Sequence, residues 1–245
     1  MSIAILCGNH DVSKRFTRHM MERHAFNIAF VEMEGHSNVL TQVSINEQVR
    51  LLQYKSEEDT IKNIKELGVT TVVLAWWPKI VHKINKLGIN VINTHPSYLP
   101  YNRGKYPYYW AIVDGTPFGA TIHRVDDGID TGTILWRSEV LLDPTDTGET
   151  AYGKAANAML ELLYEHAEDI ANEKFPSGFK QDESKATSHF ARELEVPPIE
   201  NRSERAFIND LRARTFDNAH SGRRIIIDGK TYRVHVRLVE DDGHN

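Results

Sequence analysis

An asparagine and a histidine stand two residues apart behind a short apolar run, in the stretch VINTHPSYLPYNRG that begins at Val91. If Ile89–Ile92 is a buried strand, Asn93 and His95 lie at its carboxyl end and point the same way, because side chains alternate along extended backbone. Ligands of open parallel sheets bind beyond this edge. The position favours a functional site, with a local hydrogen-bond network in the loop as the alternative.

Three aspartates follow in a second polar stretch, HRVDDGIDTG. Asp126, Asp127 and Asp130 share a glycine-bearing loop between two expected strands. They could form a solvated loop or a site for a hard cation, but no further ligands follow at the spacing of a recognisable calcium loop. We therefore predict no metal site and consider the loop as a source of a carboxylate.

An asparagine, a histidine and an aspartate brought together suit acyl transfer to an amine. The amide of Asn93 can donate to the oxyanion that develops when a nucleophile attacks a carbonyl. His95 can carry a proton from the attacking amine to the leaving nitrogen, and Asp130 can orient the imidazole and support its cationic form. No serine or cysteine stands in a recognisable nucleophile elbow, which favours direct transfer between two bound substrates.

Short β-branched runs alternate with helix-like stretches before these motifs, which favours parallel strands joined by helical crossovers. The expected strands are Ile3–Leu6, Asn27–Met33, Thr70–Trp77 and Ile89–His95, and the expected helices are Ser13–His24 and Glu57–Gly68. Two extended segments, Gly119–Val125 and Thr131–Leu142, then flank the aspartate loop.

The C-terminal third changes in character. A long helix is expected over Glu149–Lys174, opened by a capping box from Asp146 to Glu149. Phe175–Pro198 has no period and is predicted to be a connector, Asn201–Arg214 a further helix, and RRIIIDGKTYRVHVRLVE a hairpin turning at Asp228-Gly229. The sequence thus predicts an α/β fold with a Rossmann-like, mostly parallel sheet and flanking helices in residues 1–180, followed by a small helix and β-hairpin region in residues 181–245.

Composition excludes several classes of protein. With 29 basic and 34 acidic residues the net charge is −5, which gives no general attraction to nucleic acid. The single cysteine, Cys7, permits no internal disulfide and is predicted to be a small buried hydrophobe. We find no basic leader and no run of about 18 apolar residues. We therefore expect a cytoplasmic protein with no membrane partner.

The two motifs together point to a known family. INTHPSYLPYNRG followed by GATIHRVDDGIDTGTIL resembles the core signature of the 10-formyltetrahydrofolate-dependent formyltransferases, over roughly Val69–Leu142. That family includes glycinamide ribonucleotide transformylase, methionyl-tRNA formyltransferase and the sugar-nucleotide N-formyltransferases. The resemblance implies the formyltransferase fold, 10-formyltetrahydrofolate as the formyl donor, and catalytic roles for Asn93, His95 and Asp130.

The resemblance also implies where the folate binds. Its pterin would lie between the backbone after the strand VVLAWW and the aspartate loop. The implied contacts are Leu74, Trp76 and Pro78 on one side and Arg124, Asp126, Asp127 and Gly128 on the other. Trp76 and Trp77 could instead be core aromatics. The absence of a G-x-G-x-x-G after the first strand argues against a nicotinamide or flavin.

The loop PYNRGKYPYYWA is most similar to that of the sugar-nucleotide N-formyltransferases. This resemblance implies that Asn102, Arg103 and either Tyr106 or Tyr109 border an amino sugar, and a tyrosine suits a sugar because it offers both an apolar face and a hydroxyl. A diphosphate would need cations, for which Lys79, Arg103 and Lys105 are candidates. Asn9 and His10 could also reach the acceptor, or could simply turn the chain into the first helix.

Other acceptors remain open from the sequence, namely glycinamide ribonucleotide and methionyl-tRNA. A non-catalytic module that binds folate or a nucleotide is a further alternative. We expect a homodimer, since sugar-specific members often pair and the C-terminal hairpin has an edge that needs covering. The sequence specifies neither the base of the nucleotide nor the carbon that carries the amine.

Overall fold

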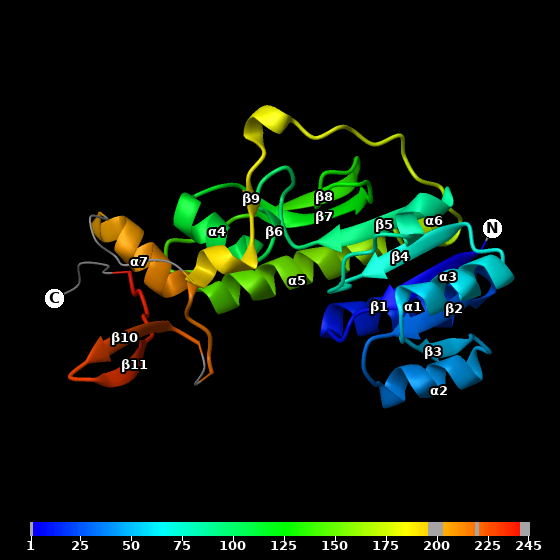
Figure 1. Cartoon of the computed structure of the whole chain (residues 1–245), viewed down its shortest axis with the longest axis horizontal. Helices are drawn as coiled ribbons and strands as arrows, with labels where there is room; N and C mark the ends of the chain where they lie inside the picture. Colours follow the sequence, from blue (N-terminus) through cyan, green and yellow to red (C-terminus); the bar gives the residue numbers. More distant parts are fainter. Residues whose placement is uncertain (1, 196–202, 219–220, 241–245) are drawn as a thin grey trace.

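Seven strands form the central sheet of the computed structural model, which describes residues 2–195, 203–218 and 221–240 (Figure 1). In the order β3-β2-β1-β4-β5-β7-β8 they are Leu51–Gln53, Ile28–Met33, Ile3–Cys7, Thr71–Ala75, Asn90–His95, Phe118–Arg124 and Ile134–Val140. The first five are parallel, whereas β7 is antiparallel to both β5 and β8. The predicted mostly parallel α/β sheet is confirmed.

Both faces of the sheet are buried under helices, as parallel strands require. One face is covered by α1 (Asp11–His24), α2 (Asn38–Asn46), α5 (Gly148–Glu165) and α6 (Ala167–Ala171), and the other by α3 (Glu57–Glu66) and the short helix η2 (Ile84–Leu87). Alternate residues of β1 serve the two cores: Ile3 and Ile5 pack with α1 and α5, and Leu6 packs with Ile64 of α3. Cys7 is buried in the first core, as predicted.

The long helix begins one residue earlier than expected. Thr147 is its N-cap, and the side chains of Thr147 and Thr150 each accept a hydrogen bond from the other's backbone amide, which forms the capping box. The predicted box from Asp146 to Glu149 is therefore wrong, although Asp146 accepts a hydrogen bond from the Thr150 hydroxyl at 2.8 Å. The helix is interrupted at His166, where α5 ends and α6 begins.

Two elements between β2 and α3 had not been predicted from the sequence. Helix α2 mixes polar and apolar residues, and β3 is a three-residue strand at the sheet edge. Neither is long or periodic enough to stand out from a loop. The expected strand Thr70–Trp77 is shorter, because Trp76 leaves the extended conformation with a φ of 48°.

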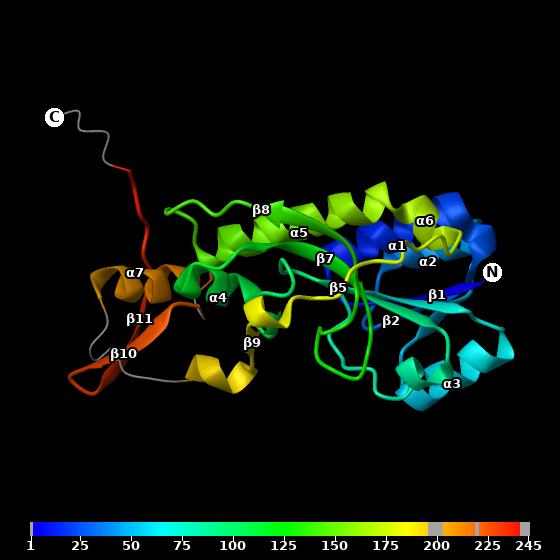
Figure 2. The ribbon, with the colours of Figure 1, turned by 90° about the horizontal axis from the view of Figure 1, so that it is seen from above.

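A third core joins the sheet to the C-terminal region. It packs Tyr109 and Ile112 of α4 (Pro107–Asp114) against Phe118 and against Ala213 of α7 (Glu204–Ala213). Asn201 and Arg202, the first residues of the predicted helix, lie outside the described residues. The predicted hairpin consists of β10 (Arg223–Ile227) and β11 (Lys230–Val234), which stand at the end of the molecule far from the N-terminus (Figures 1 and 2). Asp228 and Gly229 form its turn at φ 49° and 74°.

The expected connector is more ordered than predicted. After α6 the chain returns past β7 and β8 and descends beside β6 (Arg103–Gly104), with which β9 (Ser188–His189) pairs in parallel (Figure 1). It also contains the short helices η3 (Glu183–Lys185) and η4 (Ala191–Glu195), and Phe179 bridges to Ile134. We call residues 178–189 the strap. The end of the predicted connector, at Pro198, lies outside the described residues.

In the part of the chain that the structure describes, no helix is long and apolar enough to cross a membrane.

Candidate active site

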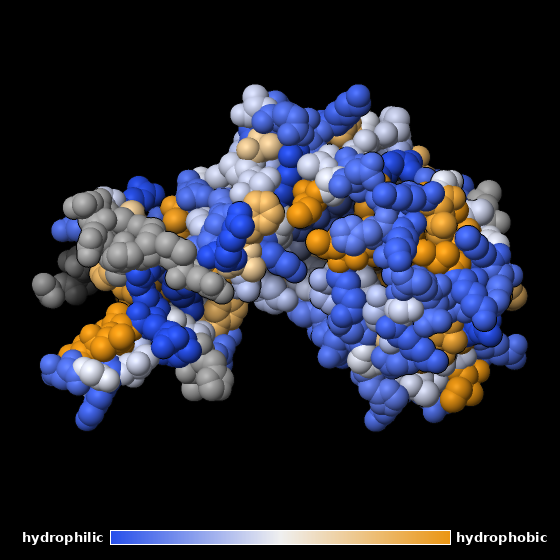
Figure 3. All heavy atoms as spheres, in the orientation of Figure 1, coloured by the Kyte–Doolittle hydropathy of each residue, from blue (hydrophilic) through white to orange (hydrophobic). Residues whose placement is uncertain are grey.

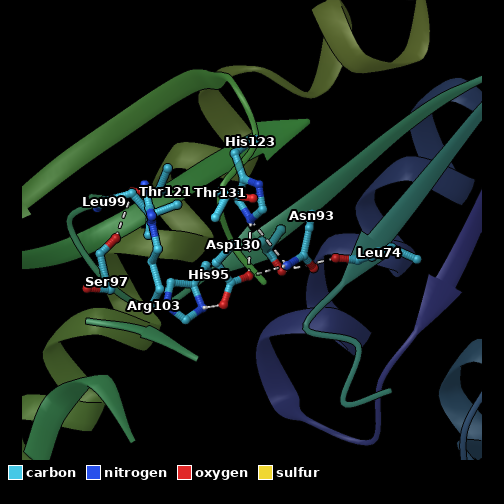
Figure 4. A network of polar contacts seen from close by, with 12 residues as sticks. Leu74, Asn93, His95, Ser97, Leu99, Arg103, Thr121, His123, Asp130 and Thr131 are labelled. Carbon is cyan, nitrogen blue, oxygen red and sulfur yellow. Dashed lines mark hydrogen bonds and ion pairs between the residues drawn. The ribbon is translucent and has the colours of Figure 1, made fainter. Parts of the chain in front are cut away.

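Strand β5 and the loop after β7 bring the predicted catalytic side chains to one place (Figure 4). Asn93 lies within β5, where it is paired with Leu74 of β4 on one side and His123 of β7 on the other. His95 is the last residue of the same strand, so both residues lie inside β5 rather than beyond its end. Their two-residue spacing sets both on one face of the strand, as predicted. The loop after β7 then delivers Asp130 to them.

Asp130 lies at the centre of the polar network (Figure 4). Its Oδ2 accepts a hydrogen bond from the Gly104 amide at 2.9 Å and lies 3.4 Å from Nδ1 of His95. Its Oδ1 lies 3.3 Å from the amide nitrogen of Asn93 and 3.4 Å from Nε2 of His123. Burial alone would raise the pKa of this carboxyl, but the two imidazoles and the Gly104 amide outweigh it and hold the pKa below its ordinary value. Asp130 is therefore an ionised carboxylate.

Oxygen atoms face both ring nitrogens of His95. Nδ1 faces the Asp130 carboxylate at 3.4 Å, and Nε2 lies 3.0 Å from the carbonyl oxygen of Asn102. Each of these oxygens can accept a hydrogen bond from the ring nitrogen that it faces. The contact with Asp130 lies at the outer limit of hydrogen-bond length, so the carboxylate faces this side of the ring without a short hydrogen bond.

His123 is a member of the site that sequence reasoning missed. Its Nδ1 donates to the carbonyl oxygen of Arg124 at 2.8 Å, and its Nε2 then points to Asp130 and lies 3.3 Å from the Asn93 amide nitrogen. The residue stands inside the quoted motif GATIHRV. Its role depends on cross-strand register with Asn93, which no spacing along the chain displays.

The residues that follow β4, which were expected to contact the folate, differ in their surroundings. The backbone after β4 lies next to the site: the Thr94 hydroxyl donates to the Leu74 carbonyl at 3.1 Å and accepts from the Trp76 amide at 2.7 Å, while Pro78 is exposed. Trp77, in contrast, is a core residue packed against Tyr54.

Arg124 is directed away from the site, contrary to expectation. Its guanidinium donates to Asn90 at 2.6 Å and lies over the ring of Phe175 at 5.5 Å, near the opposite end of β5. This occurs because β7 is antiparallel to β5, so its last residue lies towards the beginning of that strand.

Hydrogen bonds within the aspartate loop stabilise its conformation. Asp126 accepts hydrogen bonds from the Gly128 amide at 3.1 Å and the Thr131 hydroxyl at 2.5 Å, and Asp127 is exposed beside Asn85. Within residues 2–195, 203–218 and 221–240, no three histidine, cysteine or acidic side chains are arranged to hold a metal ion.

Three side chains expected to border the acceptor are used inside the protein instead. Asn102 is fully buried and donates to the Thr116 hydroxyl at 2.8 Å, so it serves the site only through its backbone carbonyl. Arg103 is buried and bound to the strap, as described below. Tyr109 is buried in the third core, where its hydroxyl donates to Asp210 at 2.5 Å. Polar residues of this loop thus hold neighbouring segments together.

The other five expected acceptor contacts have exposed or partly exposed side chains. Tyr106 is 37% exposed, and the adjacent Lys105 is also exposed. Lys79 forms an exposed ion pair with Glu34 at 2.7 Å, and Asn9 accepts a hydrogen bond from Lys14 at 2.7 Å. His10 is the N-cap of α1, where its Nδ1 accepts from the Val12 amide at 3.2 Å.

A chain of aromatic rings leads from this sheet edge towards the C-terminal region. We call it the aromatic series; its members are His10, Trp76, Tyr152, Tyr108, Tyr106 and Phe216. His10 stacks on Trp76 at 4.7 Å between ring centroids, and its Nε2 donates to the Tyr152 hydroxyl at 2.9 Å. Burial lowers the pKa of His10 and raises the pKa of Tyr108 to about 12, so both are neutral near pH 7.

A surface pocket of about 350 Å³ opens at the far end of the aromatic series. It is lined by Phe216 together with Thr147, Glu149, Thr215, Asp217, His235, Val236 and Arg237. It lies away from Asp130 and is not the catalytic centre, but Phe216 connects the two places through the rings.

The sequence profile of the Formyl transferase family matches residues 14–166, which is more than half of the 245-residue chain. The chain belongs to the formyl transferase family. A curated relative from Mycobacterium tuberculosis, dTDP-4-amino-4,6-dideoxyglucose formyltransferase, is 30% identical over 156 residues, covering 62% of this chain and 65% of the relative. The chain thus spans just under two thirds of that relative's length. Methionyl-tRNA formyltransferases are also among the curated relatives.

Solved structures of formyl transferases share the fold. A sugar N-formyltransferase from Shewanella superposes with a TM-score of 0.77 at 21% identity, over 98% of this chain and 100% of that chain. The N-formyltransferase from Helicobacter canadensis, in complex with folinic acid and dTDP-3-aminofucose, gives a TM-score of 0.70 at 19% identity, over 87% of this chain and 80% of that chain. The expected formyltransferase fold is confirmed.

Proposed function

We propose that this chain is an N-formyltransferase that moves a formyl group from 10-formyltetrahydrofolate to the primary amine of a nucleotide-linked amino deoxysugar. The observation that carries the proposal is the assembly of Asn93, His95 and an ionised Asp130 at one point of the sheet. The family supports formyl transfer, and the mycobacterial relative is named for an amino deoxysugar linked to dTDP. We place the enzyme in the cytoplasm.

In the proposed reaction, the unprotonated amine attacks the formyl carbon of the donor. A carbon–nitrogen bond forms, the carbonyl electrons move to oxygen, and collapse of the tetrahedral intermediate breaks the bond to N10. Asn93 donates to the oxyanion, and one proton passes from the amine to N10 through His95. Asp130 holds His95 in place and stabilises its cation.

The aromatic series is the proposed binding surface for the acceptor. Stacked and edge-to-face rings offer the apolar faces that sugars and nucleotide bases pack against, while Tyr106 and Tyr152 add hydroxyls. The exposed Lys105, beside Tyr106, is the candidate partner for the diphosphate. This arrangement replaces Asn102, Arg103 and Tyr109 as acceptor contacts, since their side chains are occupied within the protein.

A mass-spectrometric turnover assay tests the proposal. The protein is offered 10-formyltetrahydrofolate with a panel of dTDP-, UDP- and GDP-linked 3-amino and 4-amino deoxysugars. Glycinamide ribonucleotide and methionyl-tRNA serve as controls, because both are acceptors of other family members. We expect one sugar nucleotide to gain a formyl group. Turnover of a control alone would assign the other acceptor class, and binding of folate without any turnover would indicate a non-catalytic module.

We also propose that two copies of the chain pair through the C-terminal hairpin. Ile226 is 73% exposed, and Ile227 and Tyr232 are also exposed on the two faces of a two-stranded sheet. Figure 3 shows the hydrophobic area on this projecting lobe. A two-stranded hairpin is marginally stable by itself, so a partner surface would stabilise it.

A further inference from the structure

The strap lies directly on the two loops that build the catalytic centre. Its β9 pairs with β6 in the loop that follows His95: the Arg103 amide donates to the Thr187 carbonyl at 2.9 Å, and the Lys105 amide donates to the His189 carbonyl at 3.0 Å. Its earlier part reaches the aspartate loop through the side chain of Gln181. One segment therefore fixes both loops relative to each other.

Gln181 uses all of its side-chain hydrogen-bonding capacity in this junction. Its amide nitrogen donates to the carbonyl oxygens of Asp130 and Gly132, at 2.8 Å each. Its amide oxygen accepts from Nε and Nη2 of Arg103 at 3.0 and 2.9 Å. The opposite amide orientation would direct oxygen at two carbonyls and nitrogen at a cation, so these partners determine the orientation.

Arg103 is in turn held in place by charge. Its buried guanidinium forms a two-point ion pair with Glu183 of the strap, at 3.0 and 2.7 Å. The side chain of Glu183 is itself 72% exposed, so the ion pair lies between the buried Arg103 and the solvent. This explains why Arg103, from the motif NRG, is not a cation for the substrate.

Asp130 is thus positioned through both its backbone and its side chain. Its backbone has a φ of 54°, a left-handed conformation that few residues other than glycine adopt, and Gln181 holds the carbonyl of that same residue. Its carboxylate is oriented by the amide of Gly104. Gly104 itself lies against the strap, because a Cβ added there would approach the His189 carbonyl oxygen to 2.3 Å.

We propose that Gln181 is a positioning residue for catalysis, which sets the Asp130 carboxylate against His95 and Asn93 through the backbone of the aspartate loop. This inference rests on the proposed formyl transfer, in which Asp130 supports His95. Displacement of a catalytic group by about 1 Å can cost roughly 100-fold in rate. Gln181 therefore acts on catalysis through Asp130, although its side chain would not touch the reacting atoms.

The test variant is Gln181→Glu, which has the same shape and keeps an acceptor oxygen for both Arg103 donors but removes the donors to the two loop carbonyls. Lys180→Gln is the matched control, since it alters the charge by the same amount at the adjacent, exposed position. We expect Gln181→Glu to lower kcat by about 10- to 100-fold while KM for both substrates changes by less than about threefold. Lys180→Gln should retain wild-type kcat.

Two further measurements separate positioning from a general loss of structure. In an Asp130→Asn background, Gln181→Glu should lower the residual kcat by less than about twofold, because it acts only through Asp130. The amide proton of Gly104, which reports on the Asp130 carboxylate, should shift in the NMR spectrum of Gln181→Glu but not in that of Lys180→Gln.

The outcomes distinguish a failure of the positioning role of Gln181 from a failure of the proposed function. If wild-type protein turns over no acceptor, the proposed function fails, and the Gly104 resonance still decides whether Gln181 sets Asp130. If wild-type protein is active and Gln181→Glu keeps both its kcat and its Gly104 resonance, the positioning role is wrong. Equal losses of kcat in the presence and absence of the Asp130 carboxylate would also overturn it.

Discussion

At the scale of single residues, one carboxylate organises the site. Asp130 lies within 3.4 Å of polar atoms from β5, β7 and the loop that contains Gly104. Its contacts with His95, His123 and Asn93 are long, whereas its contact with the Gly104 backbone is short. The carboxylate is therefore fixed by the backbone and can still adjust to the side chains that meet a substrate.

Replacement of Asp130 by asparagine should abolish most turnover without unfolding the protein. The neutral amide no longer stabilises a cationic His95, so we expect kcat to fall by about 100- to 10,000-fold. Formyl transfer is measured by mass spectrometry, and circular dichroism verifies the fold. Asp59→Asn, an exposed substitution of the same kind on α3, is the control and should leave turnover within about twofold. Near-normal turnover by Asp130→Asn would contradict the mechanism.

His10 should make the stability of the protein sensitive to acid. Burial lowers its folded-state pKa below the ordinary value of 6.5, so the unfolded chain takes up the proton first as the pH falls. The folded state therefore loses stability below about pH 6.5, by no more than about 1.4 kcal/mol per pH unit. Asparagine also caps helices but does not titrate. In urea titrations, the stability of wild type relative to His10→Asn should decrease from pH 7.5 to pH 5.5; a constant difference would show that His10 titrates normally.

At the scale of elements, two glycines differ in whether the structure requires the absence of a side chain. Gly104 of β6 has a φ of 89° and no room for a Cβ, whereas Gly153 lies within α5 and a Cβ there meets nothing within 4 Å. The first is required by the strap, while the second only weakens a helix.

We therefore expect alanine to have opposite effects at these two positions. Gly104→Ala should lower the free energy of unfolding by more than about 1 kcal/mol and reduce turnover, because it strains the backbone and separates β6 from β9. Gly153→Ala should raise the free energy of unfolding by about 0.5–1 kcal/mol. Chemical denaturation measures both, and a stabilised Gly104→Ala would refute the close packing of β6 against the strap.

Sequence reasoning succeeded where a local pattern carries the information. The placement of Asn93 and His95 two residues apart on one strand, the Asp228-Gly229 turn and the alternation of strands and helices all depend on local patterns. It failed where tertiary contacts decide: Tyr109 and Tyr108 differ by one position on α4, yet the first is buried against Asp210 and the second joins the aromatic series. Arg103 was expected at a substrate for the same reason, because its partners stand far along the chain.

At the scale of the whole molecule, the sheet and the C-terminal hairpin are opposite ends joined by α5 (Figure 2). The third core, with Tyr109 and Ala213, attaches α7 to α4 between them. Few residues of the chain pack over the hairpin beyond this core, as its exposed isoleucines show.

Disruption of the hairpin surface should produce monomers. Ile226→Lys and Ile227→Lys place charges on both faces of the hairpin, so the double variant should run at half the mass of the wild-type dimer in light scattering. A matched Phe26→Lys variant, at a fully exposed aromatic far from the hairpin, should remain dimeric. A wild-type protein that is already monomeric at micromolar concentration would contradict the proposed pairing.

The strap also determines when, during synthesis, this chain can become an enzyme. Asn93, His95 and Asp130 have all left the ribosome well before the strap does, since the strap comes after the two helices α5 and α6. Until Gln181 and β9 arrive, the Asp130 carbonyl and the Gly104 backbone lack the partners that set them. A nascent chain that already contains every catalytic side chain is therefore expected to be inert, and activity should appear only when this late segment closes over the loops.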